Sequence, residues 1–230
     1  MPASPPSLSP WRTRWFFVCP VDLMAEDDCH VTVDLPELSI TLQNFRGTLS
    51  GFRNLCSHQQ LPMRAAGLGR GPLRCQHHGW TYNADGIPVG IPDGDAMVDL
   101  DLAARTLLAL TPIGVAAIEG GIFARVEDDG SLPDAAWLAE TELAGATRRH
   151  GVTRRLPAGS PPPIDGSTLG NLSVEVMGDF ALLGWVVPQG PDAIDATVAL
   201  YALAEAPDEI PAETRALYDK AAQGLAQAAG

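Results

Sequence analysis

The sequence has few basic residues and no long hydrophobic run. Fifteen Lys and Arg stand against 28 Asp and Glu, and the formal net charge is −13. This balance argues against a nucleic-acid partner, which is bound through an excess of Lys and Arg, and against an anionic lipid surface. No apolar run approaches the about 20 residues that span a bilayer, and no signal peptide is recognisable at the start. We therefore expect a cytoplasmic protein with no nucleic-acid or membrane partner.

Cysteine and histidine are also scarce, with four and five residues respectively. Cytosolic thiols are kept reduced, so we do not expect the cysteines to form disulfides. Cys19 and Cys29 stand among apolar or β-prone residues, and we interpret both as ordinary small core residues. Cys56 and Cys75 each stand close to a histidine, in the spacing of metal ligands.

The remaining composition is that of a globular chain, 46% hydrophobic and 19% charged over 230 residues. Residues 29–35 alternate with the period of a β-strand, and residues 38–45 do so more weakly. Two β-prone stretches within residues 107–126 flank a Gly120–Gly121 turn. These short strands predict a mostly β fold, α+β overall, that begins with a small antiparallel barrel or sandwich.

The positions of the Gly- and Pro-rich stretches predict four segments. Residues 1–10, rich in Pro and Ser, form a flexible arm, and residues 11–127 form the β domain. Residues 128–170 hold a helix around 135–146 and then a Pro/Arg-rich linker. Residues 171–230 form a small strand and helix segment. Its strands are expected within 171–188 and 196–204, and its helix over 212–229, with Leu217, Ala221, Leu225 and Ala228 along one face.

The strongest functional pattern is a Cys-x-His pair followed, sixteen residues later, by Cys-x-x-His. Its candidate ligands are Cys56, His58, Cys75 and His78. A tetrahedral zinc site accepts the same ligand types, but zinc fingers usually pair Cys with Cys and His with His. Alternating thiolate and imidazole ligands instead suit a Rieske [2Fe–2S] cluster, in which two thiolates hold one iron and two imidazoles hold the other. We favour the Rieske cluster.

The residues around these ligands resemble the Rieske domain of ring-hydroxylating oxygenase large subunits. The likeness rests on CSH at 56–58 and CQHHGWTYNADG at 75–86, and it extends over about residues 11–126. It implies one [2Fe–2S] cluster in a Rieske-type antiparallel β domain. Two departures stand out: Gln59–Gln60 replaces the Arg-Gly that is usual after the first histidine, and His77 stands where an aromatic residue is common.

The cytochrome bc branch of Rieske proteins differs from this sequence in two further respects. The positions that match its extra disulfide are Leu61 and His77, and Trp80 replaces a serine that donates to a cluster sulfur. Fewer hydrogen bonds to sulfur stabilise the reduced cluster less. We therefore predict a potential in the lower part of the Rieske range, which runs from about −150 to about +300 mV.

Several neighbours of the ligands allow two interpretations each. Trp80 and Tyr82 either exclude water from the cluster or are plain core aromatics. His77 could be a fifth ligand or a proton relay, but we expect it to point away from the cluster because His78 already completes the ligand set. The arginines around the ligand loops could dock an acidic ferredoxin or reductase, or could simply be solvated. These are Arg53, Arg64, Arg70 and Arg74. A second basic run is interpreted as a solvated linker or a contact to another subunit; it comprises Arg148, Arg149, Arg154 and Arg155.

The large subunits that the sequence resembles also carry a mononuclear iron held by two histidines and a carboxylate. After residue 127 this chain has a single histidine, His150, so we expect no mononuclear iron in it. Residues 171–230 are also fewer than such a catalytic domain needs. Residues 180–203 weakly resemble the closing strands of that domain, which predicts a truncated remnant with the iron site deleted.

The resemblance and the histidine count together predict an electron-transfer component of a multicomponent Rieske oxygenase. In this interpretation the chain receives single electrons from a reductase or ferredoxin and passes them to a separate catalytic subunit with non-heme iron, in a hetero-oligomer. No catalytic residue is predicted, and the chain is not expected to be a complete oxygenase alone. Two alternatives remain: a free-standing Rieske ferredoxin with an appendage, and a redox-sensing or structural subunit without turnover.

Overall fold

The structure, a computed structural model, describes residues 10–160, 167–169 and 171–229. Nearly all of the predicted flexible arm, residues 1–10, lies outside this range; the described chain begins with a short helix, α1 (Pro10–Thr13). The strands are paired antiparallel in every ladder, so the prediction of a mostly β, antiparallel fold is confirmed. In the described part of the chain, no helix has both the length and the hydropathy to cross a bilayer.

The first half of the chain folds into two sheets beside a small hairpin. One sheet has the order β1-β9-β8 and the other the order β4-β3-β2-β5. Their bounds are β1 Phe16–Pro20, β2 Cys29–Asp34, β3 Ser39–Phe45, β4 Thr48–Arg53, β5 Gly67–Arg70, β8 Gly114–Ile118 and β9 Gly121–Arg125. The hairpin consists of β6 (Thr81–Tyr82) and β7 (Pro88–Gly90) and is followed by helix α2 (Leu102–Leu107). The strands predicted from period-two alternation and around the Gly120–Gly121 turn are confirmed.

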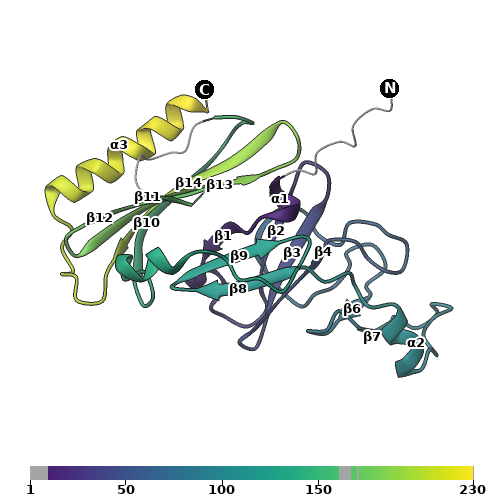
Figure 1. Ribbon diagram of the computed structural model, residues 1–230. Helices are drawn as coiled ribbons and strands as arrows, with labels where there is room; N and C mark the ends of the chain where they lie inside the picture. Colours follow the sequence, from purple (N-terminus) through teal and green to yellow (C-terminus); the bar gives the residue numbers. More distant parts are fainter. Residues whose placement is uncertain (1–9, 161–166, 170, 230) are drawn as a thin grey trace, which may run out of the picture.

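The second half is one five-stranded sheet covered by a helix. The strand order is β10-β14-β13-β12-β11, and helix α3 (Ala212–Ala228) lies across β14 and β10 (Figure 1). The strands are β10 Thr147–Pro157, β11 Ser167–Leu169, β12 Leu172–Met177, β13 Phe180–Pro188 and β14 Ala193–Ala202. The central strands β13 and β14 are apolar along almost their whole length because α3 covers one face of the sheet and the first half of the protein covers the other.

The two halves share one hydrophobic core. Phe17 of β1 packs edge-to-face against Trp185 of β13, with ring centroids 5.7 Å apart. Asn171, which is 6% exposed, joins the same strands: its Oδ1 accepts from the Phe17 N–H at 2.9 Å. Its Nδ2 donates to the carbonyls of Phe17 and Val186. The hairpin β6–β7 and helix α2 lie at the end of the molecule away from α3 (Figure 1).

Within residues 128–170 the predicted helix and the start of the predicted linker are wrong, while residues 161–166 and 170 of that linker lie outside the described range. The helix is reduced to a 3₁₀ segment, η2 (Ala136–Thr141), and residues 147–157 form β10, an edge strand that pairs with β14. Charged residues are common on edge strands, where they discourage pairing with another chain. The four arginines of β10 therefore suit an edge strand, but their composition is also that of a solvated linker. Two of them form ion pairs within the chain, Arg149 with Asp208 and Arg155 with Asp195.

Helix α3 has nearly the predicted bounds, and its predicted face is half right, because Leu225 is buried and Ala221 packs against the same hydrophobic cluster. Thr214, Tyr218 and Leu225 are buried, whereas Leu217 is 40% exposed and Ala228 is exposed. Pro211 stands immediately before the helix, where its missing N–H costs nothing. The pattern of aliphatic residues does not identify the buried face of the helix, because that face includes Tyr218. The Tyr218 ring packs at a tilt against the imidazole of His150 in β10.

Candidate metal centre

Two loops that carry the predicted ligands are built alike. The first is closed by a bridge between Leu55 and Pro62, and the second by a bridge between Arg74 and Thr81. In each loop the backbone N–H of the cysteine donates to the carbonyl of the fifth residue after it, at 2.9 Å in the first loop and 2.8 Å in the second. In each, the cysteine carbonyl accepts from the N–H of the fourth residue after it. The two loops therefore have equivalent backbone hydrogen bonds, and Cys56 in the first loop corresponds to Cys75 in the second.

The fourth residue after each cysteine has a left-handed backbone, with φ of 55° at Gln60 and 77° at Gly79. A Cβ on Gly79 would lie 2.8 Å from Arg74 Nη2 and 3.3 Å from Pro92 Cγ, so the second loop leaves no easy room for a side chain there. In the first loop Gln60 adopts this conformation with a side chain, at the position where the resemblance led us to expect glycine.

The matching of the loops explains why the second contains two adjacent histidines. His77 occupies the position equivalent to His58, and His78 follows one residue later. The rings of His58 and His78 lie close together, with centroids 4.9 Å apart. The His77 ring lies 6.5 Å from that of His78, and its Nε2 is 3.1 Å from the carbonyl oxygen of Pro62 in the first loop. His77 thus links the loops at their rim, which agrees with the expectation that it points away from the ligands.

Both cysteines are buried, at 2% exposure for Cys56 and 1% for Cys75. Burial raises the pKa of the Cys56 thiol, whereas the Tyr82 hydroxyl and the His58 backbone N–H oppose that rise and the adjacent Cys75 thiol adds to it. The Tyr82 hydroxyl lies 3.0 Å from Cys56 Sγ and accepts a hydrogen bond from the Ser57 N–H at 3.2 Å. A thiolate at Cys56 would accept from this hydroxyl, which is the donor that the sequence analysis missed.

His58 is held with one ring nitrogen free. Its ring stacks on the indole of Trp80, with centroids 4.9 Å apart and planes within 3°. Nε2 lies 3.7 Å from Asp95 Oδ2, while Nδ1 is buried without a hydrogen-bond partner. Buried polar atoms are normally paired, so an unpartnered imidazole nitrogen in a loop that also buries a cysteine thiol is the kind of atom that a metal ion satisfies.

Asp95 is a residue of this site that no sequence motif indicates. Its Oδ2 accepts from the Trp80 indole N–H at 2.8 Å, and its Oδ1 accepts from the Met97 N–H at 2.9 Å. The Trp80 bond, followed by the Met97 bond, lowers the pKa of the Asp95 carboxyl. The carboxylate therefore fixes the indole against His58, and Trp80, which is fully buried, contacts a predicted ligand while also serving as core.

The arginines around the loops divide into two groups. Arg64 donates to Gln43 Oε1 at 2.7 Å and to the carbonyls of Gly71 and Pro72, and burial lowers its pKa to about 10. Arg70 forms an ion pair with Glu26. Arg64 and Arg70 thus hold the segment between the two ligand loops against the rest of the domain. Arg53 and Arg74 form no ion pair among the described residues, so the charge available for a partner is smaller than the sequence suggested.

Comparison with known proteins finds a family that matches the part of the chain with the ligand loops. Residues 14–105 match the family described as the Rieske [2Fe-2S] domain. The two ligand loops lie within this range, so it is this part of the chain that is similar to a Rieske [2Fe–2S] domain. No curated protein sequence matches the chain.

Solved structures extend the likeness beyond that domain. The apo form of the quaternary ammonium Rieske monooxygenase CntA has a TM-score of 0.67 and 12% identity, with 95% of this chain and 77% of that chain covered. Naphthalene 1,2-dioxygenase from Rhodococcus sp., bound to indole, has a TM-score of 0.64 and 16% identity, with 94% of this chain and 72% of that chain covered. Nearly the whole chain therefore has the fold of Rieske oxygenase large subunits.

The residues present suit the cluster that this family binds. The buried thiols of Cys56 and Cys75, the unpartnered His58 Nδ1 and the adjacent His78 ring supply two sulfur and two nitrogen donors. Within the described ranges, no three His, Cys, Asp or Glu side chains converge as the ligands of a single metal ion. A Rieske centre requires a different arrangement, two ligands on each of two irons.

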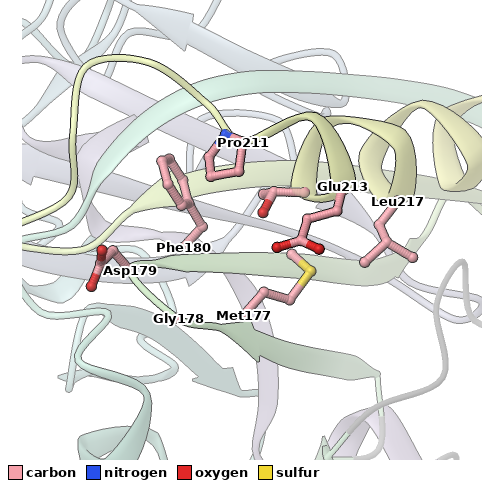
Figure 2. A pocket seen from close by; sticks show the side chains of 8 residues that line it. Met177, Gly178, Asp179, Phe180, Pro211, Glu213 and Leu217 are labelled. Atoms are coloured by element: carbon pink, nitrogen blue, oxygen red, sulfur yellow. The ribbon is translucent and has the colours of Figure 1, made fainter.

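The α3 side of the second half has a pocket of about 430 Å³ at the start of the helix. Figure 2 shows Met177, Glu213 and Leu217 gathered at one side of it and Asp179 at the other. Its lining contains carboxylates but no histidine. His150 instead accepts a hydrogen bond from Arg215 Nη1, with 2.7 Å between the nitrogens.

Proposed function

We propose that this chain is the electron-transfer subunit of a multicomponent Rieske-type oxygenase. Cys56, His58, Cys75 and His78 hold one [2Fe–2S] cluster, which supplies reversible one-electron chemistry when bound. The electron donor is a reductase or ferredoxin, and the acceptor is a separate catalytic subunit with non-heme iron. The assembly is a hetero-oligomer, and its location is the cytoplasm, where the free thiols stay reduced.

The observation that carries this proposal is the pair of matched loops, which differ in the position of the candidate histidine ligand. Each loop buries a cysteine, and the ring of His78, one residue beyond the position equivalent to His58, lies beside that of His58. The remaining side chains have supporting roles: Trp80 and Asp95 orient His58, and Tyr82 donates to Cys56. His78 is exposed, so this edge of the site faces outward, where an electron-transfer partner would dock.

The histidine inventory supports a separate acceptor. A two-histidine, one-carboxylate iron site cannot be assembled from residues after 127, because His150 is the single histidine there. His150 is also engaged with Arg215 and Tyr218. The fold of an oxygenase large subunit without these ligands is the expected form of a subunit that delivers electrons to another polypeptide.

Metal analysis of the purified chain tests the cluster. The expected content is two irons and two acid-labile sulfides per chain, with no third iron, and a reduced-state EPR signal with a low average g. One zinc without sulfide would refute the assignment of the site. The His78→Cys variant should retain the cluster at a lower potential, because thiolate replaces a neutral ligand; the His77→Cys variant is the matched control, with no change in potential.

Purification from the native host tests the partner. A stable complex with an iron-containing subunit is the expected outcome, together with oxidation of the reduced chain when that subunit is added. The alternative, a free-standing Rieske ferredoxin with an appendage, predicts the same metal content but no stable complex. A chain that shuttles as a monomer between reductase and oxygenase would therefore replace our proposal with the alternative.

A further inference from the structure

A second cavity, of about 230 Å³, lies between the two halves of the protein, on the face of the C-terminal sheet opposite to α3. It is bounded by β1, β2 and β5 on one side and by β10, β13 and β14 on the other. Part of its wall is apolar and buried. This part comprises Val18, Cys19, Val31, Val33, Trp185 and Val187.

The register of β10 against β14 decides which polar groups reach this cavity. Arg148 pairs with Tyr201, Thr153 with Thr197 and Arg155 with Asp195, so these residues share the face that meets the first half. Gly151 lies between them on the same row and leaves room for Arg148. A Cβ at Gly151 would fall 1.9 Å from Arg148 Nη2, so the guanidinium lies across the glycine.

Of the charged groups at the cavity, one carboxylate is paired and one guanidinium is not. Asp195 receives both Nε and Nη2 of Arg155, at 2.9 and 3.2 Å, and its charge is neutralised there. The hydroxyls of Thr153 and Thr197 bond to each other at 2.8 Å. The Arg148 guanidinium lines the cavity half-buried, and it has neither an ion pair nor a side-chain hydrogen bond to any described residue. It is the one uncompensated charge of the lining.

We propose that this cavity binds a small organic carboxylate, with the acid on Arg148 and the apolar body against Trp185, Val31 and Val33. A guanidinium is suited to a carboxylate because its parallel N–H groups meet both oxygens. An apolar wall with one placed charge is the usual composition of a small-molecule site. The volume selects a single-ring or short-chain acid. The protein's net charge of −13 does not prevent binding, since charges beyond about 8 Å are screened at physiological salt.

This site is separate from the proposed cluster. None of Cys56, His58, Cys75 and His78 lines the cavity, and the proposal stands whether or not the chain transfers electrons. The ligand would nevertheless touch both halves, because Gly67 and Leu68 of β5 belong to the segment between the two ligand loops and Trp185 belongs to the C-terminal sheet. A bound acid would thereby strengthen the contact between the halves.

Isothermal titration calorimetry of the full chain with benzoate tests the proposal, with benzamide as the uncharged analogue of the same shape. We expect saturable one-site binding of benzoate and at least about tenfold weaker binding of benzamide, since a charge-assisted pair is lost. Arg148→Gln should weaken benzoate binding by a similar factor. Arg154→Gln is the matched control, because Arg154 lies on the same strand and faces away from the cavity, and its affinity should stay within about twofold.

A second variant guards against an effect on folding. Thr153 is exposed at the mouth of the cavity, so Thr153→Phe should narrow the mouth and abolish benzoate binding while leaving the circular dichroism spectrum and iron content unchanged. Absence of saturable benzoate binding to the unaltered chain would overturn the proposal. Equal affinities for benzoate and benzamide, or an unchanged affinity in Arg148→Gln, would overturn it as well.

Discussion

A single hydroxyl, that of Tyr82, sets the environment of the proposed sulfur ligand Cys56. It lies 3.0 Å from Cys56 Sγ, and its other hydrogen-bonding capacity is used by the N–H and hydroxyl of Ser57. The backbone therefore orients the phenol toward the sulfur. Burial, with the contact to Cys56, raises the pKa of Tyr82, so the phenol stays protonated and remains a donor. The lower potential predicted from Trp80 must be weighed against this donor.

Tyr82→Phe is expected to lower the reduction potential. A hydrogen bond to a sulfur ligand stabilises the more negative, reduced state, and its loss costs about 1 kcal/mol of that preference, or about 40 mV for one electron. Protein-film voltammetry measures the shift. Tyr218→Phe, whose ring lies over His150 in the second half, serves as the control and should leave the potential unchanged. A potential equal to that of the unaltered chain would show that the phenol does not donate to the sulfur.

Helix α3 illustrates how an element takes its stability from one face. The helix contains no proline, and its one glycine, Gly224, is exposed. Its stability therefore depends mainly on the contacts of its buried face rather than on intrinsic helix propensity. Tyr218 and Leu225 belong to the hydrophobic cluster that the helix forms with β10, β13 and β14. Leu217 lies outside that cluster, at the wall of the pocket near Met177 (Figure 2).

Two leucines of α3 therefore form a matched pair for mutagenesis. Leu225→Ala should reduce the free energy of unfolding by about 2–3 kcal/mol, because the side chain is 3% exposed and leaves a cavity. Leu217→Ala should change it by less than about 1 kcal/mol, because that side chain is 40% exposed. Urea denaturation measures both. Equal losses would mean that the helix docks on the face that the sequence alone suggested.

At the scale of the whole molecule, the halves are not independent lobes. Residues of β1, β2 and β9 share a core with residues of β12, β13 and β14. Asn171 crosses this boundary with hydrogen bonds to both backbone groups of Phe17. The hairpin β6–β7, which follows the second ligand loop, lies at the end of the molecule remote from α3, so the shared core lies between the hairpin and the helix (Figure 1).

Asn171→Ala should destabilise the whole molecule by about 2–4 kcal/mol, because it leaves the buried N–H and C=O of Phe17 and the C=O of Val186 without that partner. Since the core is shared, unfolding should remain a single transition when followed by both the visible absorption of the cluster and far-ultraviolet circular dichroism. Gln223→Ala, which removes an exposed amide on α3, is the control and should have little effect. Two separate transitions in the unaltered chain would contradict the shared core.

The sequence by itself determined the strands of the first half, the helix at 212–228 and the four candidate ligands. Strand alternation is local, and ligand spacing is written directly in CSH and CQHHGW. The tertiary structure decided the rest. It showed that residues 147–157 pair with β14, since an arginine-rich edge strand and a linker have the same composition. It also placed Asp95 beside Trp80, Tyr82 on Cys56 and Arg148 beside an apolar cavity. Each of these contacts joins segments whose proximity depends on chain topology and packing, which local residue patterns do not specify.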